Sequence, residues 1–429
     1  MDNLTHTLIG VLAGESCARG LGSLPSGLAA STRRNTLVWL VGIGSNLPDA
    51  DFLYSVVSGN PLDYLLQHRG YTHTVLGALA LGALLLAATE VVLRARGLAL
   101  RAEDRALFGA AVLGALLLHL AMDYSNSYGV HPFWPVDERW RYGDSVFIVE
   151  PLLWAAAAPL VLLLRTRTAR FAVALALLAA VMVSLGSGLV PRPLPYVLIA
   201  LIAGMLLAAR ILSPGAALAT GLTLWLVVTG LFVAAGHVAS VRAAAIAREH
   251  FPQARLIDVV LTPGPVDPVC WEALFLEREP TRYVARRAML SLAPGWLPAA
   301  ACPARMLASA SSAPLTAVPA PTERAVAWYG EFALPPGALA ALAENNCRAA
   351  AFLRFARAPY LARVHGVQVI GDLRFDRGQG PSFAQLALDA ERGCPRHVPP
   401  WEPPREDLLH GADATIAAQR SAATLGEAR

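Results

Sequence analysis

Residues 68–93 read HRGYTHTVLGALALGALLLAATEVVL, a short polar stretch followed at once by a long apolar one. The apolar part, Val75 to Leu93, approaches the roughly 20 residues with which a helix crosses a bilayer. The polar part places His68, Arg69 and His73 at the beginning of this helix. Polar residues are costly to hold at a membrane helix, so their presence here indicates a functional site.

The composition is that of an integral membrane protein. Of 429 residues, 55% are hydrophobic and only 15% are charged, and the mean hydropathy is +0.48. These values lie outside the range of soluble globular domains. The formal net charge of +4 gives no reason to expect nucleic-acid binding. The N-terminus lacks a basic stretch before a cleavable apolar core, so we expect no signal peptide.

The apolar segments predict a mainly α-helical, polytopic membrane bundle of about seven to eight helices over residues 1–240. The expected spans are 35–57, 74–93, 107–124, 147–164, 171–190, 194–212 and 216–238, with Asn3–Ala18 as a segment that either spans or lies in the interface. Pro48 interrupts the span at 35–57. Such a break is tolerable where the backbone lines a buried or wet cavity.

Arginines set the expected orientation, because short cytoplasmic loops are enriched in basic residues. If the spans alternate, the arginines on the cytoplasmic side are Arg33, Arg34, Arg94, Arg96, Arg101, Arg105, Arg165, Arg167, Arg170 and Arg210. The short loops on the opposite side hold Arg69, Arg139, Arg141 and Arg192. We therefore expect residues from about 240 onward to be extracytoplasmic, with membrane lipid around the bundle.

Residues 241–397 predict a smaller extracytoplasmic domain of α+β or β-rich type. They hold most of the prolines, scattered charge and no run long enough to span. Pieces with period-2 or β-branched character are 255–261, 269–276, 325–332 and 364–375. A Pro/Ala/Ser linker is expected at about 308–322, and 398–429 are expected to form a disordered tail.

Four of the five cysteines, Cys270, Cys302, Cys347 and Cys394, fall in this C-terminal domain. On an oxidising side of the membrane they are compatible with two disulfides, and three pairings are open. The alternative is four buried free thiols.

Three polar clusters predict a shared metal site. The expected ligands are His6, Asp49, Asp51, His68, His73, His119 and Asp123. His119 and Asp123 are spaced i,i+4 and so share one helix face. The predicted topology brings the residues from Asp49 to Asp123 to the outer ends of their segments, and His6 as well if its own segment spans the membrane. Mixed imidazole and carboxylate ligands suit a divalent ion such as zinc or manganese, and this many donors allow two ions.

Each of these residues also has a structural explanation. Asp49 could cap a helix that restarts after Pro48, and the stretch 123–129 could be a helix end closed by Gly129. A lone histidine in an apolar helix, such as His237, is more often a packing residue. Secondary candidates for the site are His6, His131, Asp144 and Glu150.

The N-terminal half resembles a bacterial family of membrane-bound, metal-dependent hydrolases, described as inner-membrane hydrolases of the LexA-binding type. The residues that carry the resemblance are Asp2 to Thr7, Ser45 to Asp51, His68 to His73, His119 to Asp123 and the continuation to Gly129. It covers about residues 1–240, and the C-terminal domain looks like the extension of longer members. The resemblance implies a multi-pass protein of the bacterial inner membrane, in which the seven expected ligands form the metal-binding or catalytic set.

These observations together lead us to expect a hydrolase of a phosphoester or ester, possibly lipid-like, that acts where the membrane meets water. Asp49 or Asp51 would be the general base, and Arg69 would bind an anionic oxygen of the small-molecule or lipid-like substrate. The alternatives are a transporter or receptor that binds ions at the same cluster, and a structural membrane protein without catalysis.

Overall fold

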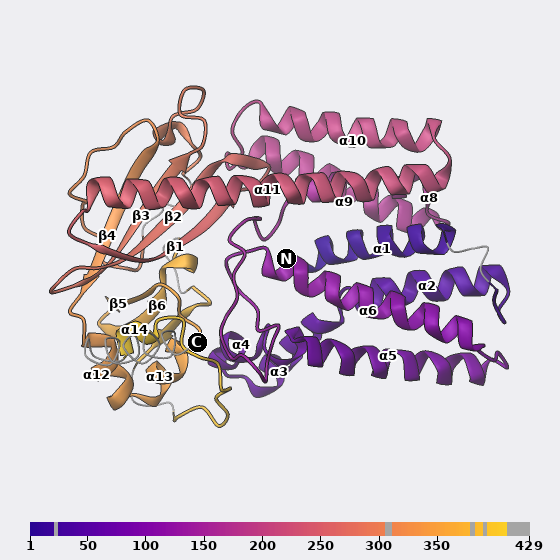
Figure 1. Ribbon diagram of the computed structural model, residues 1–429, viewed down its shortest axis with the longest axis horizontal. Coiled ribbons are helices and arrows are strands. Elements are labelled where there is room, and N and C mark those ends of the chain that lie inside the picture. Colours follow the sequence, from indigo (N-terminus) through magenta and orange to yellow (C-terminus); the bar gives the residue numbers. More distant parts are fainter. Residues whose placement is uncertain (21–24, 305–310, 378–381, 389–392, 410–429) are drawn as a thin grey trace, which may run out of the picture.

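The computed structural model describes residues 1–20, 25–304, 311–377, 382–388 and 393–409. Within them, a bundle of helices occupies one end of the molecule and antiparallel sheets occupy the other (Figure 1). The expected order, a mainly helical membrane part followed by a part that contains sheets, is therefore confirmed.

Among the described residues, five helices are long and apolar enough to cross a membrane. They are α5 (Val75–Ala95), α6 (Ala102–Tyr124), α9 (Arg167–Gly186), α10 (Leu194–Ile211) and α11 (Pro214–His250). About seven to eight were expected. The difference arises partly because two further helices of the bundle do not qualify: α1 (Asn3–Gly20) is long enough but not sufficiently apolar, and α2 (Ala30–Gly44) is too short.

The segment expected to span at 35–57 is broken at Pro48, as predicted. α2 ends at Gly44, and Pro48 lies in the 3-10 helix η1 (Leu47–Asp51). Three short elements then lead to α5: α3 (Phe52–Ser58), α4 (Pro61–Gln67) and the 3-10 helix η2 (Tyr71–His73). Thr74 is the N-cap residue of α5, because its hydroxyl oxygen accepts a hydrogen bond from the backbone N–H of Gly77 at 2.8 Å.

The span expected at 147–164 is wrong. This segment forms two short helices, α7 (Pro151–Ala155) and α8 (Leu160–Leu163), joined by a turn. The side chains of residues 155–158 are fully buried. The segment is apolar because it lies in the protein core, and hydropathy alone does not separate a buried core segment from a lipid-facing one.

The C-terminal region contains two antiparallel sheets. The first consists of β1 (Arg255–Gly264), β2 (Asp267–Arg278), β3 (Tyr283–Ser291) and β4 (Val326–Leu334), in that order; the second consists of β5 (Pro359–Val364), β6 (Val367–Asp372) and β7 (Gln385–Ala387). The short helices are η3 (Ala299–Ala301), α12 (Ala338–Asn345), α13 (Cys347–Leu353), η4 (Leu373–Phe375) and α14 (Glu406–Leu409).

Three predicted strands correspond to β1, β2 and β4, whereas the piece expected at 364–375 holds a turn, β6 and η4. β3 was not predicted, because Arg286 and Arg287 interrupt its apolar pattern. Both arginines are nevertheless buried, and Arg286 forms an ion pair with Glu331 at 2.8 Å.

Part of the tail expected to be disordered is folded. Trp401 is fully buried, and its indole N–H donates to the carbonyl oxygen of Leu66 at 2.8 Å. The expectation of disorder is therefore wrong for residues 398–409, and 410–429 lie outside the described residues. Of the expected linker, 308–310 also lie outside them, and Thr316 forms a β-bridge with Glu331 of β4.

The four C-terminal cysteines form two disulfides, Cys270–Cys302 and Cys347–Cys394. The structure thus selects one of the three pairings that the sequence left open.

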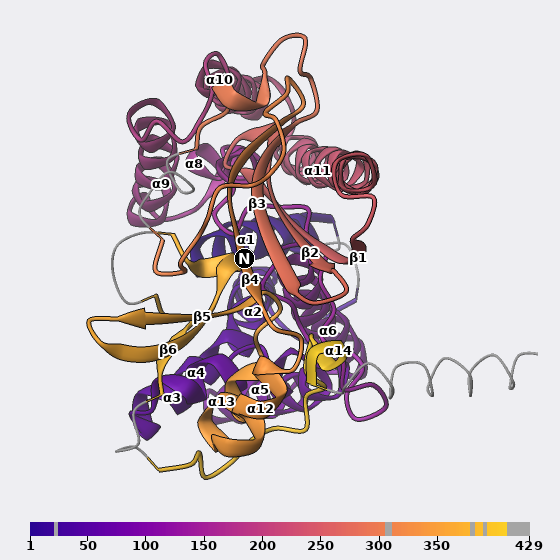
Figure 2. The same cartoon turned by 90° about the vertical axis from the view of Figure 1, so that its left-hand side faces the viewer.

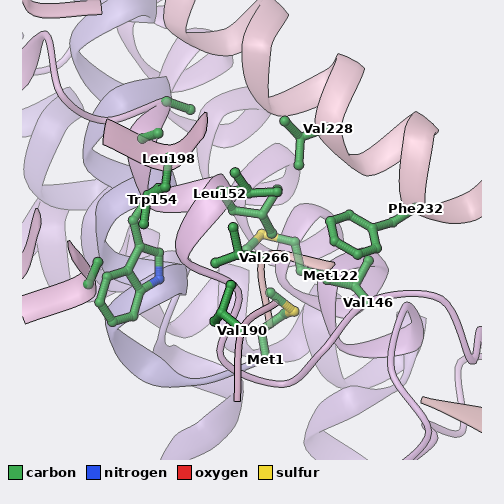
Figure 3. Close-up of a cluster of buried hydrophobic side chains, with 14 of the residues drawn as sticks. Met1, Met122, Val146, Leu152, Trp154, Val190, Leu198, Val228, Phe232 and Val266 are labelled. Carbon is green, nitrogen blue, oxygen red and sulfur yellow. The ribbon is translucent and has the colours of Figure 1, made fainter. Parts of the chain in front are cut away.

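One hydrophobic core joins the bundle to the first sheet. α11 is 37 residues long, about 55 Å of helix, and runs from the bundle onto β1 and β2 (Figures 1 and 2). Val266, in the turn between β1 and β2, belongs to the same buried cluster as Met1, Met122 and Val146 (Figure 3). The C-terminal region is therefore packed directly on the end of the bundle.

Candidate metal centre

The polar clusters meet at the end of the bundle that faces the C-terminal region. Asp49 lies in η1, His73 ends η2, and His119 and Asp123 lie in the last two turns of α6. The two 3-10 helices contact each other, and η1 also contacts α6. This packing brings together residues that lie as many as 74 positions apart in the chain.

Four side chains each direct one potential ligand atom to a common point. These atoms, from Asp49, His73, His119 and Asp123, all lie within 4.8 Å of one another, and all four residues are buried. Nε2 of His73 is 3.3 Å from Oδ1 of Asp49 and 3.0 Å from Oδ2 of Asp123. Nε2 of His119 is 3.6 Å and 3.3 Å from the same two oxygens, and the two Nε2 atoms are 3.0 Å apart.

Hydrogen bonds on the far side of each imidazole assign its tautomer. Nδ1 of His119 lies 2.8 Å from the carbonyl oxygen of Ser45, which can only accept, so Nδ1 donates and Nε2 carries the lone pair. Nδ1 of His73 lies 3.0 Å from the hydroxyl oxygen of Thr72, whose own proton is donated to Asp51, and 3.3 Å from Oδ2 of Asp51. Both neighbours can accept a proton from Nδ1, which favours the same tautomer. Both Nε2 lone pairs therefore face the common point.

This set of donors suits a cation. Two imidazoles and two carboxylates converge at a point where all four residues are buried, and Asp49 alone of the four lines the cavity described below. Within the described residues, Oδ1 of Asp49 and Oδ2 of Asp123 have no hydrogen-bond partner. Bonds of about 2.0–2.1 Å to a tetrahedral ion would separate its ligand atoms by about 3.3–3.4 Å. Five of the six separations among the four atoms are 3.0–3.6 Å, which brackets this value, and the two carboxylate oxygens lie within 4.8 Å of each other. The four residues could therefore hold a divalent metal ion.

His6 lies beside the four converging residues. Its ring stacks on that of His119 with centroids 3.9 Å apart, and its Nε2 is 3.2 Å from Oδ1 of Asp123. His6 therefore contacts the oxygen of Asp123 that is not directed at the other two histidines.

Asp51 and His68 lie one layer behind the converging atoms. Oδ1 of Asp51 is 2.8 Å from Nδ1 of His68, and Oδ2 accepts the hydroxyl of Thr72 at 2.7 Å. Burial would raise the pKa of the Asp51 carboxyl, but hydrogen bonds from His68 and His73 outweigh it and hold this pKa well below its ordinary value. Asp51 is thus a carboxylate that orients two imidazoles, a common arrangement behind metal-binding histidines.

Arg69 is held tightly against the centre. Its guanidinium lies 2.9 Å from Oδ1 of Asp123 and donates to Oδ1 of Asn126 at 2.9 Å. Asp123 also contacts the α-amino group of Met1. The backbone of Arg69 has a φ of +59°, a strained conformation for an L-residue, and its N–H donates to Asp51 at 3.0 Å. Arg69 therefore orients Asp123, and it also lines the cavity described below.

Trp401, which the sequence did not indicate as part of the site, packs against the turn that carries Arg69. A side chain at Gly70 would approach the carbonyl oxygen of Gln67 to 2.8 Å and the ring of Trp401 to 3.1 Å, so only glycine fits there. His131, a secondary candidate, stacks on the same Trp401 ring with centroids 3.9 Å apart. Burial lowers the pKa of His131 to about 3. His131 therefore supports the turn and is not one of the four converging residues.

The other two secondary candidates connect the bundle to the sheets. Asp144 pairs with Arg357 at 2.8 Å. The Glu150 carboxylate accepts the backbone N–H of Leu152 and, at 3.1 Å, that of Val266. Burial raises the pKa of Glu150 to about 8. Neither carboxylate is among the four converging residues.

A cavity of about 680 Å³ lies against the centre. Asp49, His68 and Arg69 line it from the bundle, and Phe375 and Arg377 line it from the C-terminal region. One residue of the four-donor cluster thus borders a space large enough for a small organic molecule.

Comparison with known proteins gives one match. Residues 1–191 match a family described as YdjM inner membrane protein. The match covers Asp49, His73, His119 and Asp123 but ends before α10. No curated protein and no solved structure matches the chain. Together with the five apolar helices, the match supports a membrane location; it says nothing of hydrolysis.

Proposed function

We propose that the chain is a metal-dependent hydrolase of phosphoesters or related esters. The observation that carries the proposal is the convergence of Asp49, His73, His119 and Asp123 beside a cavity. A divalent ion held by these residues would polarise a phosphoryl or carbonyl oxygen and acidify water. Zinc and manganese are the ions that this donor set favours.

His68 and Asp51 supply the means to move a proton. The carboxylate of Asp51 holds the proton of His68 on Nδ1, at 2.8 Å, which leaves Nε2 as the atom that can accept one. The side chain of His68 lines the cavity and is 13% exposed. We therefore assign general-base or general-acid catalysis to His68, with Asp51 as its orienting partner, in place of the expected role of Asp51 as the base.

The distribution of charge favours an enzyme over a transporter. A path for ions would need polar residues along the length of the bundle. Between Arg105 and His119, α6 carries only apolar residues and glycine. Glu90, the one acidic residue of α5, pairs with Arg105 at 2.7 Å.

We also propose that the centre lies at the extracytoplasmic side of the bacterial inner membrane. Arg94 at the end of α5 and Arg101 before α6 lie at the opposite end of the bundle from the centre, whereas Arg69 and Arg192 lie at the end that holds it. Basic residues favour the cytoplasmic side. The two disulfides of the C-terminal region suit an oxidising compartment.

The test is hydrolysis by purified protein in a neutral detergent, loaded with zinc or manganese. The substrates are p-nitrophenyl phosphate, bis-p-nitrophenyl phosphate and p-nitrophenyl butyrate. We expect D49N to lose both metal and activity, H68Q to lose activity but keep its metal, and H237Q, on the exposed face of α11, to keep both. Absence of hydrolysis in the metal-loaded wild type, or full activity in D49N, would overturn the proposal.

A further inference from the structure

The C-terminal region supplies one wall of the cavity at the metal centre. Phe375, Arg377 and Phe383 line this cavity together with Asp49 and His68. All three wall residues follow residue 191, where the match to the YdjM family ends. The surface that a bound molecule would meet is therefore not set by the matched part of the chain alone.

Buried hydrogen bonds hold this wall against the polar turns. Arg374 precedes Phe375 and pairs with Asp372 at 2.8 Å. Its Nη1 also donates to the carbonyl oxygen of Ser127 at 2.8 Å. Ser127 follows Asn126, the residue that accepts a hydrogen bond from Arg69. The wall and the metal centre are thus kept in one relative position.

Aromatic rings from both parts of the chain border the cavity. Phe383 packs edge-on against Tyr64 of α4, with centroids 6.0 Å apart, and lies 4.8 Å from Phe375. Phe375 in turn lies 5.7 Å from Tyr128. The side chain of Phe383 is 49% exposed, so its ring is available to a further apolar group.

Two guanidinium groups accompany these rings. Arg69 lies beside Asp123, and Arg377 lies in the wall, 3.3 Å from the carboxylate of Glu272. Arginine pairs well with phosphate and carboxylate oxygens. A ligand that matches both features has an anionic group and an apolar part.

An exposed apolar helix adjoins the cavity. Phe52 lines the cavity and begins α3, in which none of the residues is buried. Val56 and Val57 of this helix are 67% and 87% exposed. Such a surface at the end of a membrane bundle suits the boundary between headgroups and acyl chains. The helix α3 thus offers an apolar surface beside the cavity, against which a hydrocarbon chain could lie.

We propose that the wall formed by Phe375, Arg377 and Phe383 selects a membrane lipid whose headgroup is an anionic phosphate monoester. The headgroup lies between the metal centre and Arg377, and the hydrocarbon chain lies against the aromatic rings and α3. Hydrolysis of the headgroup rests on the proposed hydrolase function, whereas binding of the lipid does not.

The first measurement is lipid retention by native mass spectrometry, in a neutral detergent with dioleoyl phosphatidic acid or dioleoyl phosphatidylcholine added. We expect the wild type to retain the phosphatidic acid in preference to the phosphatidylcholine. F383A should weaken retention of both lipids, and R377Q should remove the preference. R363Q, at an exposed position of β5, is the matched control, and R377K tests whether charge alone restores the preference if R377Q proves unstable.

The second measurement compares kcat/KM for dioleoyl phosphatidic acid in mixed micelles with that for p-nitrophenyl phosphate. Loss of the Phe383 ring should lower the value for the lipid about tenfold and leave that for the soluble ester within about twofold. Equal retention of the two lipids by the wild type, or equal effects of F383A on both substrates, would overturn this inference while the hydrolase remains. Selective lipid retention without hydrolysis would support lipid selection by the wall and overturn the proposed hydrolase function.

Discussion

Asp49 and Asp51 lie two residues apart in η1, yet the structure gives them different tasks. Asp49 directs an oxygen at the common point, whereas Asp51 orients His68 and His73 from behind. Asparagine has nearly the shape of aspartate but lacks its charge. D49N and D51N therefore form a matched pair. The same chemical change affects a candidate metal ligand in D49N and the carboxylate that orients His68 and His73 in D51N.

The expected losses follow from these positions. Partners behind metal-binding histidines contribute about 10–100-fold to affinity, which is about 1.4–2.8 kcal/mol. In D51N the amide oxygen can still accept the backbone N–H of Arg69 and the hydroxyl of Thr72, so the loss should fall in that range. D49N replaces one of the four converging donors, a charged carboxylate oxygen, by a neutral amide oxygen that binds zinc or manganese more weakly, and should lose at least about tenfold more.

Competition with a chromophoric chelator would measure zinc and manganese affinity for both variants in detergent, and elemental analysis would give the bound stoichiometry. We expect D51N to bind its metal at the wild-type stoichiometry once the ion is in excess. Equal losses in the two variants, or a greater loss in D51N, would refute the division between ligand and support.

Three further predictions concern the junction of the bundle and the sheets. R357Q removes the guanidinium that pairs with Asp144 and Asp258, whose side chains are 15% and 21% exposed, and should lower the free energy of unfolding by about 1–3 kcal/mol. R139Q, at an exposed ion pair with Asp137, should leave it almost unchanged; urea titration would compare the two variants. The raised pKa of Glu150, about 8 against an ordinary 4.5, means that its protonated form stabilises the fold. That stabilisation is complete below pH 4.5 and is lost as the pH rises through 8, so unfolding at a series of pH values should show a fall on the order of 5 kcal/mol that E150Q lacks; equal slopes would contradict this. Reduction of Cys347–Cys394, which encloses 47 positions, should cost about 4 kcal/mol; mass mapping without reductant would show whether this pairing is the one formed.

The sequence was informative where the chemistry is local. Pro48 predicts the break in the first long segment, and the i,i+4 spacing of His119 and Asp123 predicts their common face. Both statements depend on residues within a few positions of each other. The meeting of these clusters also followed from counting spans, even though the span at 147–164 was wrong.

The sequence was uninformative where a contact joins distant parts of the chain. Asp51 and His68 looked like ligands because only their packing shows that they lie behind His73. β3 was not predicted because Arg286 looked like a solvent-exposed charge. Its buried partner, Glu331, lies 45 positions away in the chain. Trp401 looked like part of a polar tail because its hydrogen-bond acceptor, Leu66, precedes it by 335 positions.

The placement of Trp401 also has a consequence for biosynthesis. The turn that carries Arg69 and His73 is synthesised before Trp401, whose indole packs on Gly70 and donates to Leu66, 335 positions earlier in the chain. The helices of the bundle can therefore enter the bilayer before this contact forms, and a product that ends before Trp401 would have the four converging side chains without the support that holds the turn of Arg69 and His73 in shape.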